Sequence, residues 1–221
     1  MKELTKIKYW IFDLDNTLYS GDTKVFDQVD KKMSAFISDK LNVSIEEAKK
    51  IQKSYFHEYN TTLNGMIKNH EIDANEFLDF VHDVNLDFLK KNKPLEQEIT
   101  NLNGKKFIFT NGSKAHVANV TKRIGIEKLF DGVFDIVESD FIPKPSIEPY
   151  KKIIEKYKIE PQYSIFIEDI ARNLKPAHEL GMKTVWIKND EPWAAEFSDS
   201  DFINYKTDNL AEFLKEINGF K

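Results

Sequence analysis

The sequence predicts an α/β fold, in which a parallel sheet carries helices on both faces and a helical domain is inserted after the first strand. Short apolar runs alternate with helical patterns along most of the chain, which is typical of a parallel sheet. The stretch from about residue 20 to residue 93 is instead helical throughout. The chain has 221 residues, enough for a core with a smaller insertion. We therefore expect a core domain of residues 1–19 and 94–221 and a helical domain of residues 20–93.

Apolar and aromatic runs predict the strands of the sheet. Residues 7–12 (IKYWIF) run directly into the acidic and turn-forming DLDNT. Continuous apolar runs of this length are typical of strands that are buried on both faces. The further predicted strands are residues 106–110 (KFIFT), 133–137 (VFDIV), 163–168 (YSIFIE) and 183–187 (KTVWI), with a possible edge strand at 202–205 (FINY).

Helical periodicity and capping residues predict the helices. Apolar residues recur every three or four positions in residues 25–41, and Ser44 with Glu47 forms a capping box that begins a second helix. Further helical segments at 63–69 and 74–81 complete a small bundle. In the core, Ser113 and Ser146 are placed to cap helices, Gly181 follows a helix at 173–180, and a last helix covers about 209–218. Together these elements predict a Rossmann-like core.

Composition excludes several classes of function. The net charge of −5 argues against a nucleic acid polymer as partner, although a local cation can still attract a small anion. The absence of cysteine excludes disulfides and thiolate chemistry. The N-terminal residues carry no signal-peptide pattern, and no apolar run approaches the ~20 residues that span a bilayer. We expect a cytoplasmic protein without a membrane partner. The oligomeric state is not indicated.

Polar side chains follow the predicted strands at the edge where parallel sheets bind ligands. Each motif taken alone is commonly a turn, a loop or a solvated acidic pair. All of them follow strands in chain order, which favours a shared function. The residues are Asp13, Asp15 and Thr17 after the first strand, Thr110, Asn111 and Gly112 after the second, Lys144 after the third, and Glu168 and Asp169 after the fourth.

These residue types fit the transfer of a phosphoryl group to a carboxylate. Carboxylates bind Mg²⁺, which removes the repulsion between a phosphate dianion and a carboxylate nucleophile. An aspartate with a pKa of ~3.9 is already ionised at neutral pH and needs no base. A second acid must protonate the leaving alcohol, so we expect its pKa to lie above that of the nucleophile. Lysine, a hydroxyl and a free backbone N–H suit the phosphate oxygens.

The strings FDLDNTLY, FTNGS, PKP and FIEDIARNL resemble the four ordered motifs of the haloacid dehalogenase-like (HAD) phosphohydrolase superfamily. The resemblance covers nearly the whole chain, and the helical insertion resembles the C1 cap of that superfamily. Longer strings are similar to bacterial pyrimidine 5′-nucleotidases. They are TTLNGMIKNH, FVHDVNL, FTNGSKAHV, FDIVESDFIPKP and FIEDIARNLKPAHELGM.

The resemblance implies a role for each motif. Asp13 attacks phosphorus and becomes an aspartyl phosphate, and Asp15 acts as general acid and then as general base. Asp13, the backbone carbonyl of Asp15, and Asp169 bind Mg²⁺. The phosphoryl oxygens are held by Thr110 and Lys144, together with Asn111 and Gly112.

The fourth motif departs from the wider superfamily. Glu168 stands where glycine is frequent, and Leu174 stands where a later aspartate often lies. Glu168 is therefore a candidate for water-mediated metal binding, and Asn173 is a candidate for supporting a metal ligand.

The insertion supplies candidates for substrate specificity, namely His57, Tyr59, Thr62, Asn64 and Met66, and Arg172 lies near the fourth motif. The alternative is that Tyr59 and Met66 are bundle core, that His57 and His82 are structural, and that Arg172 pairs with a surface acid. Trp186 and Trp193 are expected to pack.

We interpret the chain as a Mg²⁺-dependent phosphomonoester hydrolase acting on a small phosphorylated metabolite, with a pyrimidine nucleoside 5′-monophosphate as the favoured substrate. One alternative is a HAD-like phosphatase or phosphomutase for a sugar phosphate or another small organophosphate. Another is an inactive binding module with the same fold. A haloacid dehalogenase is disfavoured, because that chemistry lacks the second aspartate, which is present here as Asp15.

Overall fold

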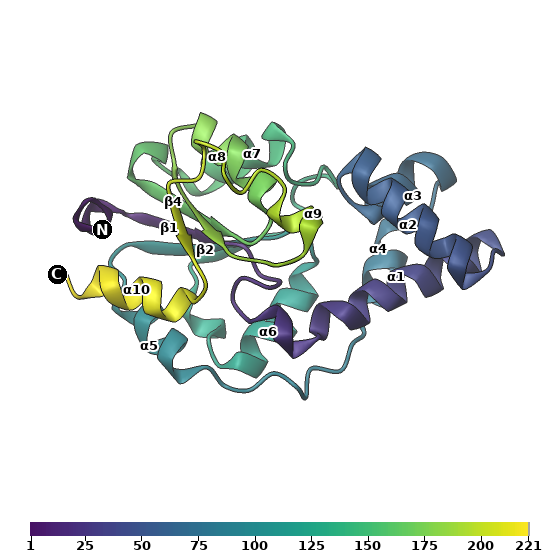
Figure 1. Cartoon of the computed structure of the whole chain (residues 1–221), viewed down its shortest axis with the longest axis horizontal. Coiled ribbons are helices and arrows are strands. Elements are labelled where there is room, and N and C mark those ends of the chain that lie inside the picture. Colours follow the sequence, from purple (N-terminus) through teal and green to yellow (C-terminus); the bar gives the residue numbers. More distant parts are fainter. Residues whose placement is uncertain (221) are drawn as a thin grey trace.

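The structure is a computed structural model that describes residues 1–220. Within these residues, six strands form one parallel sheet in the order β3-β2-β1-β4-β5-β6. Helices cover both faces of the sheet, and a helical bundle lies at one end of the molecule (Figure 1). The predicted fold class is confirmed. The strands are β1 (Tyr9–Phe12), β2 (Lys105–Phe109), β3 (Gly132–Phe134), β4 (Ser164–Glu168), β5 (Lys183–Ile187) and β6 (Tyr205–Thr207).

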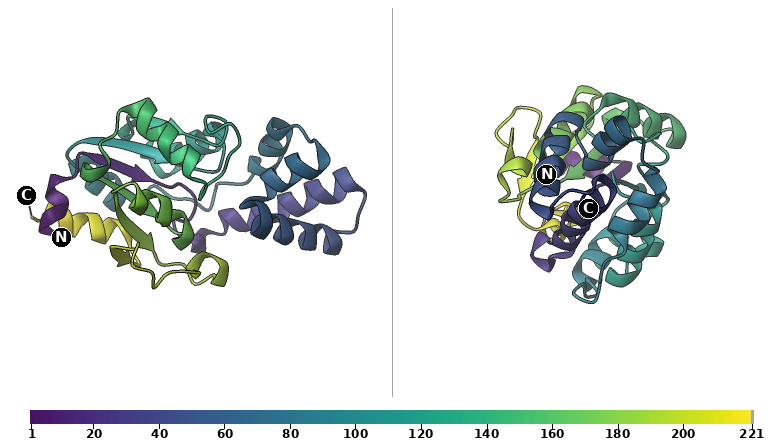
Figure 2. Two further views of the ribbon diagram at one scale, coloured as in Figure 1. Left: turned by 90° about the horizontal axis from the view of Figure 1, so that it is seen from above. Right: turned by 90° about the vertical axis from the view of Figure 1, so that its right-hand side faces the viewer.

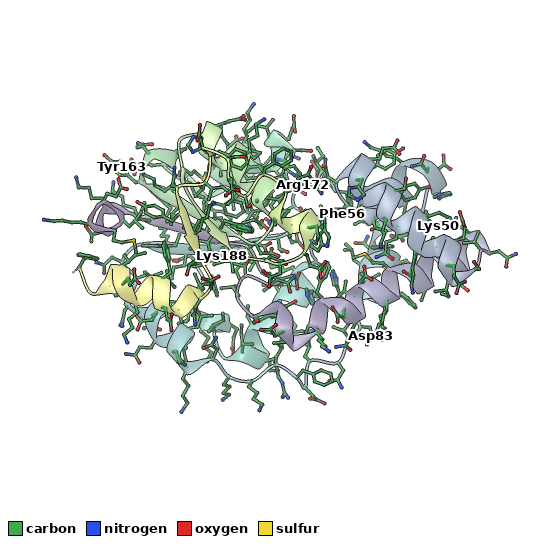
Figure 3. The ribbon with its side chains drawn as sticks, in the orientation of Figure 1. Lys50, Phe56, Asp83, Tyr163, Arg172 and Lys188 are labelled. Atoms are coloured by element: carbon green, nitrogen blue, oxygen red, sulfur yellow. The ribbon has the colours of Figure 1, made fainter. Side chains whose placement is uncertain are left out.

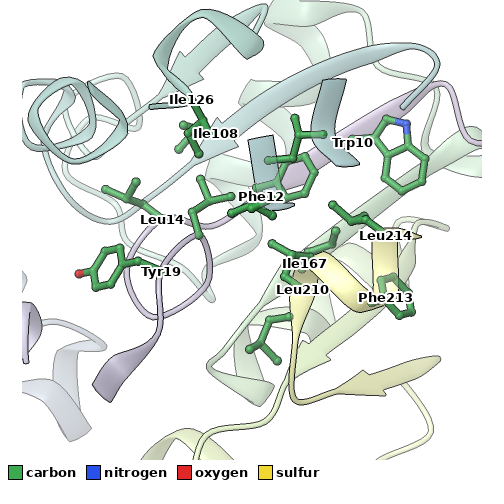
Figure 4. Close-up of a cluster of buried hydrophobic side chains, with 14 of the residues drawn as sticks. Trp10, Phe12, Leu14, Tyr19, Ile108, Ile126, Ile167, Leu210, Phe213 and Leu214 are labelled. Atoms are coloured by element: carbon green, nitrogen blue, oxygen red, sulfur yellow. The ribbon is translucent and has the colours of Figure 1, made fainter. Parts of the chain in front are cut away.

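Side chains of each strand alternate between two hydrophobic layers, as the pleat requires. Trp10 and Phe12 of β1 join the layer that contains α5 (Lys93–Asn101), α6 (Lys114–Ile124) and α10 (Leu210–Asn218). Figure 4 shows part of this layer, with Tyr19 beside Leu14 at its margin and the Tyr19 hydroxyl directed away from the other labelled side chains. Ile11 faces the opposite layer, which contains α7 (Ile147–Tyr157) and α8 (Leu174–Glu179).

The strand order reverses at β1, which pairs with β2 on one side and β4 on the other. Phe12 is in register with Ile108 of β2 and with Ile167 of β4. The three strands therefore end at the same level, and the residues that follow them meet at one edge. Ligands bind in open parallel sheets at such a reversal point.

The inserted bundle has a hydrophobic core of its own. It consists of α1 (Val25–Leu41), α2 (Ile45–Tyr59), α3 (Thr62–His70) and α4 (Ala74–His82). Phe36, Ile37, Met66, Phe77 and Val81 are among its buried residues. The left view of Figure 2 shows the bundle projecting beyond the carboxyl edge of the sheet, and the right view looks at the molecule with the bundle in front.

Short helical turns connect the larger elements. They are η1 (Lys2–Lys6), η2 (Gly21–Thr23), η3 (Glu127–Leu129), η4 (Pro161–Tyr163), η5 (Ala171–Asn173) and α9 (Pro192–Ala195). Among residues 1–220, none of the helices combines the length and the apolar character that crossing a membrane requires.

Two strands have a boundary three residues away from the expected one, and one helix was not expected. The third strand ends at Phe134, because the Asp135 carboxylate accepts hydrogen bonds from the backbone N–H groups of Lys114 and Glu138 and turns the chain. The last strand is Tyr205–Thr207 rather than residues 202–205, since Thr184 bonds to the Phe202 carbonyl through its hydroxyl and to the Asn204 side chain through its N–H. Helix α5 was not expected, and it begins after Asn92, whose side chain caps it.

Candidate active site

Lys144 connects the ends of β1, β2 and β4. Its Nζ atom lies 2.7 Å from Asp13 Oδ1, 2.6 Å from Glu168 Oε2 and 3.0 Å from the carbonyl oxygen of Phe109. The Lys144 side chain is only 1% exposed. An ammonium group so completely buried is stable only where carboxylates and carbonyls surround it. The sequence predicts that Lys144 lies beside a phosphate. In the structure it contacts the carboxylates of Asp13 and Glu168.

A cluster of buried carboxylates lies around this lysine. Asp13, Glu168 and Asp169 each offer an oxygen, and these oxygens lie within 4.8 Å of one another. Burial and the Glu168 carboxylate raise the pKa of Asp13 to about 7, although Lys144 opposes the shift. Burial, Glu168 and Asp13 also raise the pKa of Asp169 well above its ordinary value. One ammonium group does not neutralise three carboxylates, so the donor set fits a divalent cation.

Neighbouring side chains fix the orientation of Asp169. The Asn189 Nδ2 atom donates to Asp169 Oδ2 at 2.7 Å, and the Trp186 Nε1 atom donates to the Asp169 carbonyl at 2.6 Å. Hydrogen bonds of this kind orient metal-binding carboxylates. Asn189 lies just beyond β5 and escaped the sequence analysis, which considered the ends of the first four strands alone.

The loop after β2 is held in place by its own side chains. The Gly112 N–H donates to Thr110 Oγ1 at 2.9 Å, so the free N–H expected at this glycine is already bonded. Asn111 Oδ1 accepts from the Lys144 backbone N–H at 2.9 Å. Asn111 therefore joins two loops, while the Thr110 hydroxyl keeps its proton available for a ligand.

The Asp15 carboxylate accepts two hydrogen bonds at one oxygen. Tyr19 Oη and His116 Nε2 lie 2.5 Å and 2.8 Å from Asp15 Oδ1. Burial raises the pKa of Asp15, but His116 and the Tyr19 hydroxyl outweigh it and lower that pKa to about 2. The expectation that the second acid has the higher pKa is therefore wrong for this structure. Asp13 shares its surroundings with other carboxylates, whereas Asp15 has a basic partner.

His116 in turn contacts a histidine of the bundle. The rings of His82, at the end of α4, and His116, in the first turn of α6, stack with centroids 4.3 Å apart and an interplanar angle of 13°. Ser113 Oγ lies 3.0 Å from His82 Nδ1. His116 was missed by sequence reasoning, and its one signal was its place in FTNGSKAHV, three residues after the capping serine.

A cavity of about 340 Å³ lies between the sheet edge and the bundle. Volumes of this order are typical of small-molecule sites. Its core-side wall is mostly polar, and its bundle-side wall carries apolar side chains together with polar ones such as Gln52 and Asn60. The core side includes Asp13, Asp15, Thr110, Asn111, Gly112, Lys144, Glu168, Asp169 and Asn173, and the bundle side includes Val29, Met33, Phe77, Leu78 and Val81.

The candidate specificity residues divide into two groups. His57, Thr62 and Arg172 line the cavity. Tyr59, Asn64 and Met66, all within the described chain, lie outside its lining. The Tyr59 ring contacts Tyr55, the Asn64 amide donates to the Tyr59 carbonyl, and Met66 is buried in the bundle core. Helical spacing alone could not distinguish the face towards the cavity from the face towards the bundle core.

Arg172 and Phe56 meet where the bundle approaches the core (Figure 3). The Arg172 guanidinium carbon lies 4.6 Å from the Phe56 ring centroid, and the Trp193 ring lies 5.3 Å from it at 81°. All three residues line the cavity. Trp193 was expected only to pack, and Phe56 was not considered, because nothing in the local sequence places an α2 side chain against α9.

Comparisons with known proteins indicate the family of the chain. A family model described as haloacid dehalogenase-like hydrolase matches residues 7–181. Phosphate metabolism protein 8 of Saccharomyces cerevisiae is 34% identical over 95% of this chain and 70% of its own. Glyceraldehyde 3-phosphate phosphatase of Methanocaldococcus jannaschii is 25% identical over 97% of this chain and 99% of its own.

Solved structures share the fold at lower identity. A HAD-hydrolase from Bacillus subtilis, solved bound to magnesium, matches with a TM-score of 0.60 at 17% identity, over 96% of this chain and 99% of its own. L-2-haloacid dehalogenase from Xanthobacter autotrophicus matches with a TM-score of 0.57 at 14% identity, over 97% and 100% of the two chains. Likeness at this level extends to the fold and not to the reaction.

Proposed function

The chain belongs to the haloacid dehalogenase-like hydrolase family, and from this premise we propose that it is a Mg²⁺-dependent phosphomonoester hydrolase in which Asp13 is the nucleophile. The observation that carries the proposal is the meeting of Asp13, Lys144, Glu168 and Asp169 at the end of the sheet, with Lys144 Nζ 2.7 Å from Asp13 and 2.6 Å from Glu168.

The residues that would hold Mg²⁺ are Asp13, Asp169 and the backbone carbonyl of Asp15, with Glu168 close enough to bind directly or through water. When bound, the ion supplies positive charge that offsets the repulsion between the phosphate and these carboxylates. Asn189 and Trp186 keep Asp169 in place for this role.

Two displacements at phosphorus account for hydrolysis. In the first, an Asp13 oxygen forms a bond to phosphorus, the bond from phosphorus to the ester oxygen breaks, and Asp15 gives a proton to the leaving alcohol. In the second, Asp15 takes a proton from water, the water oxygen bonds to phosphorus, and the bond to Asp13 breaks. Lys144 and the Thr110 hydroxyl hold the phosphoryl oxygens in both steps.

The low pKa of Asp15 keeps it ionised, which is the form that the second displacement needs, although so low a pKa makes it a weak base. The first displacement needs its protonated form. We expect the substrate to help, because a phosphate dianion beside Asp15 raises the pKa of that carboxyl. A bound divalent cation lowers the pKa of Asp13 in the same complex, so the order of the two values reverses there.

For the substrate, we propose a nucleoside 5′-monophosphate, with a pyrimidine base favoured by the sequence resemblance. The apolar side chains on the bundle side of the cavity support this choice, because a heteroaromatic ring gains more from contact with them than a hydroxyl-rich sugar does. In this proposal residues 20–93 act as a cap that excludes water from the site. His57, Thr62 and Arg172 are the candidates that line the cavity.

A small sugar phosphate is the second candidate substrate. The relative from Methanocaldococcus jannaschii, which aligns over nearly the whole chain, is named for glyceraldehyde 3-phosphate. A dehalogenase is less well supported, because a phosphatase needs a second acid and Asp15 is present, hydrogen-bonded and beside the cavity.

The test is a phosphate-release screen across nucleotides and sugar phosphates, run with Mg²⁺ and again with a chelator. We expect uridine monophosphate to be among the best substrates and chelation to abolish turnover. If unrelated sugar phosphates were hydrolysed as fast as uridine monophosphate, the proposed nucleotidase activity would be rejected. The Asp13→Asn variant should fold and be inactive, and undiminished Mg²⁺-dependent activity in it would reject the nucleophile.

A further inference from the structure

We propose that His116 is a positioning residue that holds Asp15 for its two proton transfers, and that His82 makes this hold depend on where the helical bundle sits. The inference rests on the proposed function, because it assigns Asp15 the role of acid and base. The contact between His82 of the bundle and His116 of the core links the position of the bundle to the proton transfers of Asp15.

The contact between His116 and Asp15 is buried and direct. The His116 side chain is 1% exposed, and its Nε2 atom lies 2.8 Å from Asp15 Oδ1. Its other ring nitrogen, Nδ1, is buried without a hydrogen-bond partner among the described residues. Within residues 1–220, the His116 ring therefore makes one hydrogen bond, and that bond is with Asp15. Tyr19 reaches the same oxygen at 2.5 Å from the loop after β1.

His82 holds the His116 imidazole from the bundle side of their contact. It is the last residue of α4 in the bundle, and it stacks on His116 of the core at 4.3 Å. Ser113 Oγ accepts from the His116 backbone N–H at 3.3 Å and lies 3.0 Å from His82 Nδ1. Ser113 thus contacts the His82 ring and the His116 backbone, and the stack persists only while α4 stays beside the start of α6.

The consequence is a link between cap position and catalytic geometry. A displacement of the bundle by more than a stacking distance would remove His82 from His116 and free the imidazole to turn. Asp15 would then keep Tyr19 as its remaining side-chain donor. Small losses of orientation in a proton-transferring group are costly, since catalysis depends on near-attack geometry.

Substitution of His116 by glutamine and by asparagine tests the hold on Asp15. A glutamine amide nitrogen reaches nearly as far as His Nε2, whereas the shorter asparagine does not. Both variants lose the ring stack, so they differ mainly in the bond to Asp15. With uridine monophosphate we expect kcat to fall about 10- to 100-fold more in His116→Asn than in His116→Gln, with similar KM values. Equal kcat values would overturn the proposal.

p-Nitrophenyl phosphate provides a readout that a merely structural role would not move. Its leaving group departs without a proton, so the first displacement needs no acid, while the second still needs Asp15 as base. In His116→Asn we therefore expect a rapid burst of about one equivalent of nitrophenol followed by slow turnover. Slowing of both phases by the same factor would indicate general distortion and reject positioning.

A double-mutant cycle tests the link to the bundle. His82→Ala should lower kcat in the wild-type background and lower it no further in the His116→Asn background, because its effect passes through His116. Independent, multiplying losses would mean that His82 acts on the substrate directly, and the link would be wrong.

Crystal structures of the two His116 variants separate this inference from the proposed function. Asp15 should stay hydrogen-bonded to residue 116 in His116→Gln and turn away in His116→Asn. An unmoved Asp15 in His116→Asn would overturn the inference even if the protein were an active phosphatase. Conversely, a wild-type protein that releases no phosphate from any ester would reject the function and leave this positioning result standing.

Discussion

The amino group of Lys144 lies 2.7 Å from the carboxylate of Asp13, a residue 131 positions earlier in the chain. The same nitrogen contacts Glu168 and the Phe109 carbonyl, so this one group ties together the loops after three strands. Burial opposes charge on the lysine, but Asp13 and Glu168 raise its pKa above the ordinary value. Lys144 therefore remains charged and supports both the fold and the site.

Replacing Lys144 by methionine should destabilise the metal-free protein by about 3 kcal/mol and abolish phosphatase activity, because buried carboxylates lose their partner. Urea unfolding with chelator present measures the loss. Lys152→Met is the matched control. Lys152 pairs with Asp140 at 2.5 Å, but their side chains are 35% and 79% exposed, so the cost should stay within about 1 kcal/mol. Equal losses in the two variants would contradict this account of Lys144.

Magnesium should bind more tightly as the pH rises through about 7. Burial and Glu168 raise the pKa of Asp13 from 3.8 to about 7, so below that pH a proton competes with the ion. Between these two values the folded state binds more protons than the unfolded state. Metal-free stability therefore falls as the pH rises across this window, and bound Mg²⁺ offsets the loss.

Thermal unfolding with and without Mg²⁺ at pH 6 and pH 8 measures this effect without any substrate. The gain in Tm on adding Mg²⁺ should be larger at the higher pH. In Asp13→Asn, the part of that pH dependence that Asp13 contributes should disappear, while Asp169, whose pKa is also raised, should retain a smaller part. If the rise in Tm on adding Mg²⁺ were equal at the two pH values, or larger at pH 6, Asp13 would not govern metal binding.

The parts of the site that follow strand ends could be predicted from the sequence, because parallel strands bring their carboxyl ends to one edge. This rule predicts that Asp13, Lys144 and Asp169 belong to the site. His116 and Phe56 could not be found in the same way. Their contacts, with His82 and with Trp193, depend on how the bundle sits against the sheet. Met66 was a candidate for substrate contact but is buried in the bundle core, because helical spacing cannot distinguish a side chain that faces the cavity from one that faces the bundle core.

Tyr19→Phe should lower kcat about tenfold with little change in stability of the fold, because it removes one of two donors to Asp15 and leaves the packed ring. Burial and Asp15 raise the pKa of Tyr19 well above its ordinary value, so its hydroxyl stays protonated and donates at every working pH. The control is Tyr205→Phe, which removes a hydroxyl bonded to Glu3 at the surface. If Tyr205→Phe alone lost activity, or if the two variants lost it equally, the role of Tyr19 would be contradicted.

Phe56→Ala should weaken the binding of nucleotides more than that of smaller phosphate esters. The Phe56 ring reaches from α2 to Arg172 at 4.6 Å and to Trp193 at 5.3 Å, and these side chains line the cavity together. A contact between the Phe56 ring and a nucleobase would contribute about 1 kcal/mol, so the KM for uridine monophosphate should rise about fivefold.

Glycerol phosphate is the comparison substrate, because its short chain gains little from an aromatic wall, and its KM should change less than that of the nucleotide. The matched control is Phe88→Ala, whose ring is 61% exposed and lies outside the cavity lining, and which should leave both KM values unchanged. If Phe56→Ala raised the two KM values by the same factor, Phe56 would act only in seating the bundle on the sheet domain. The proposed contact between Phe56 and the organic group of the substrate would then be rejected.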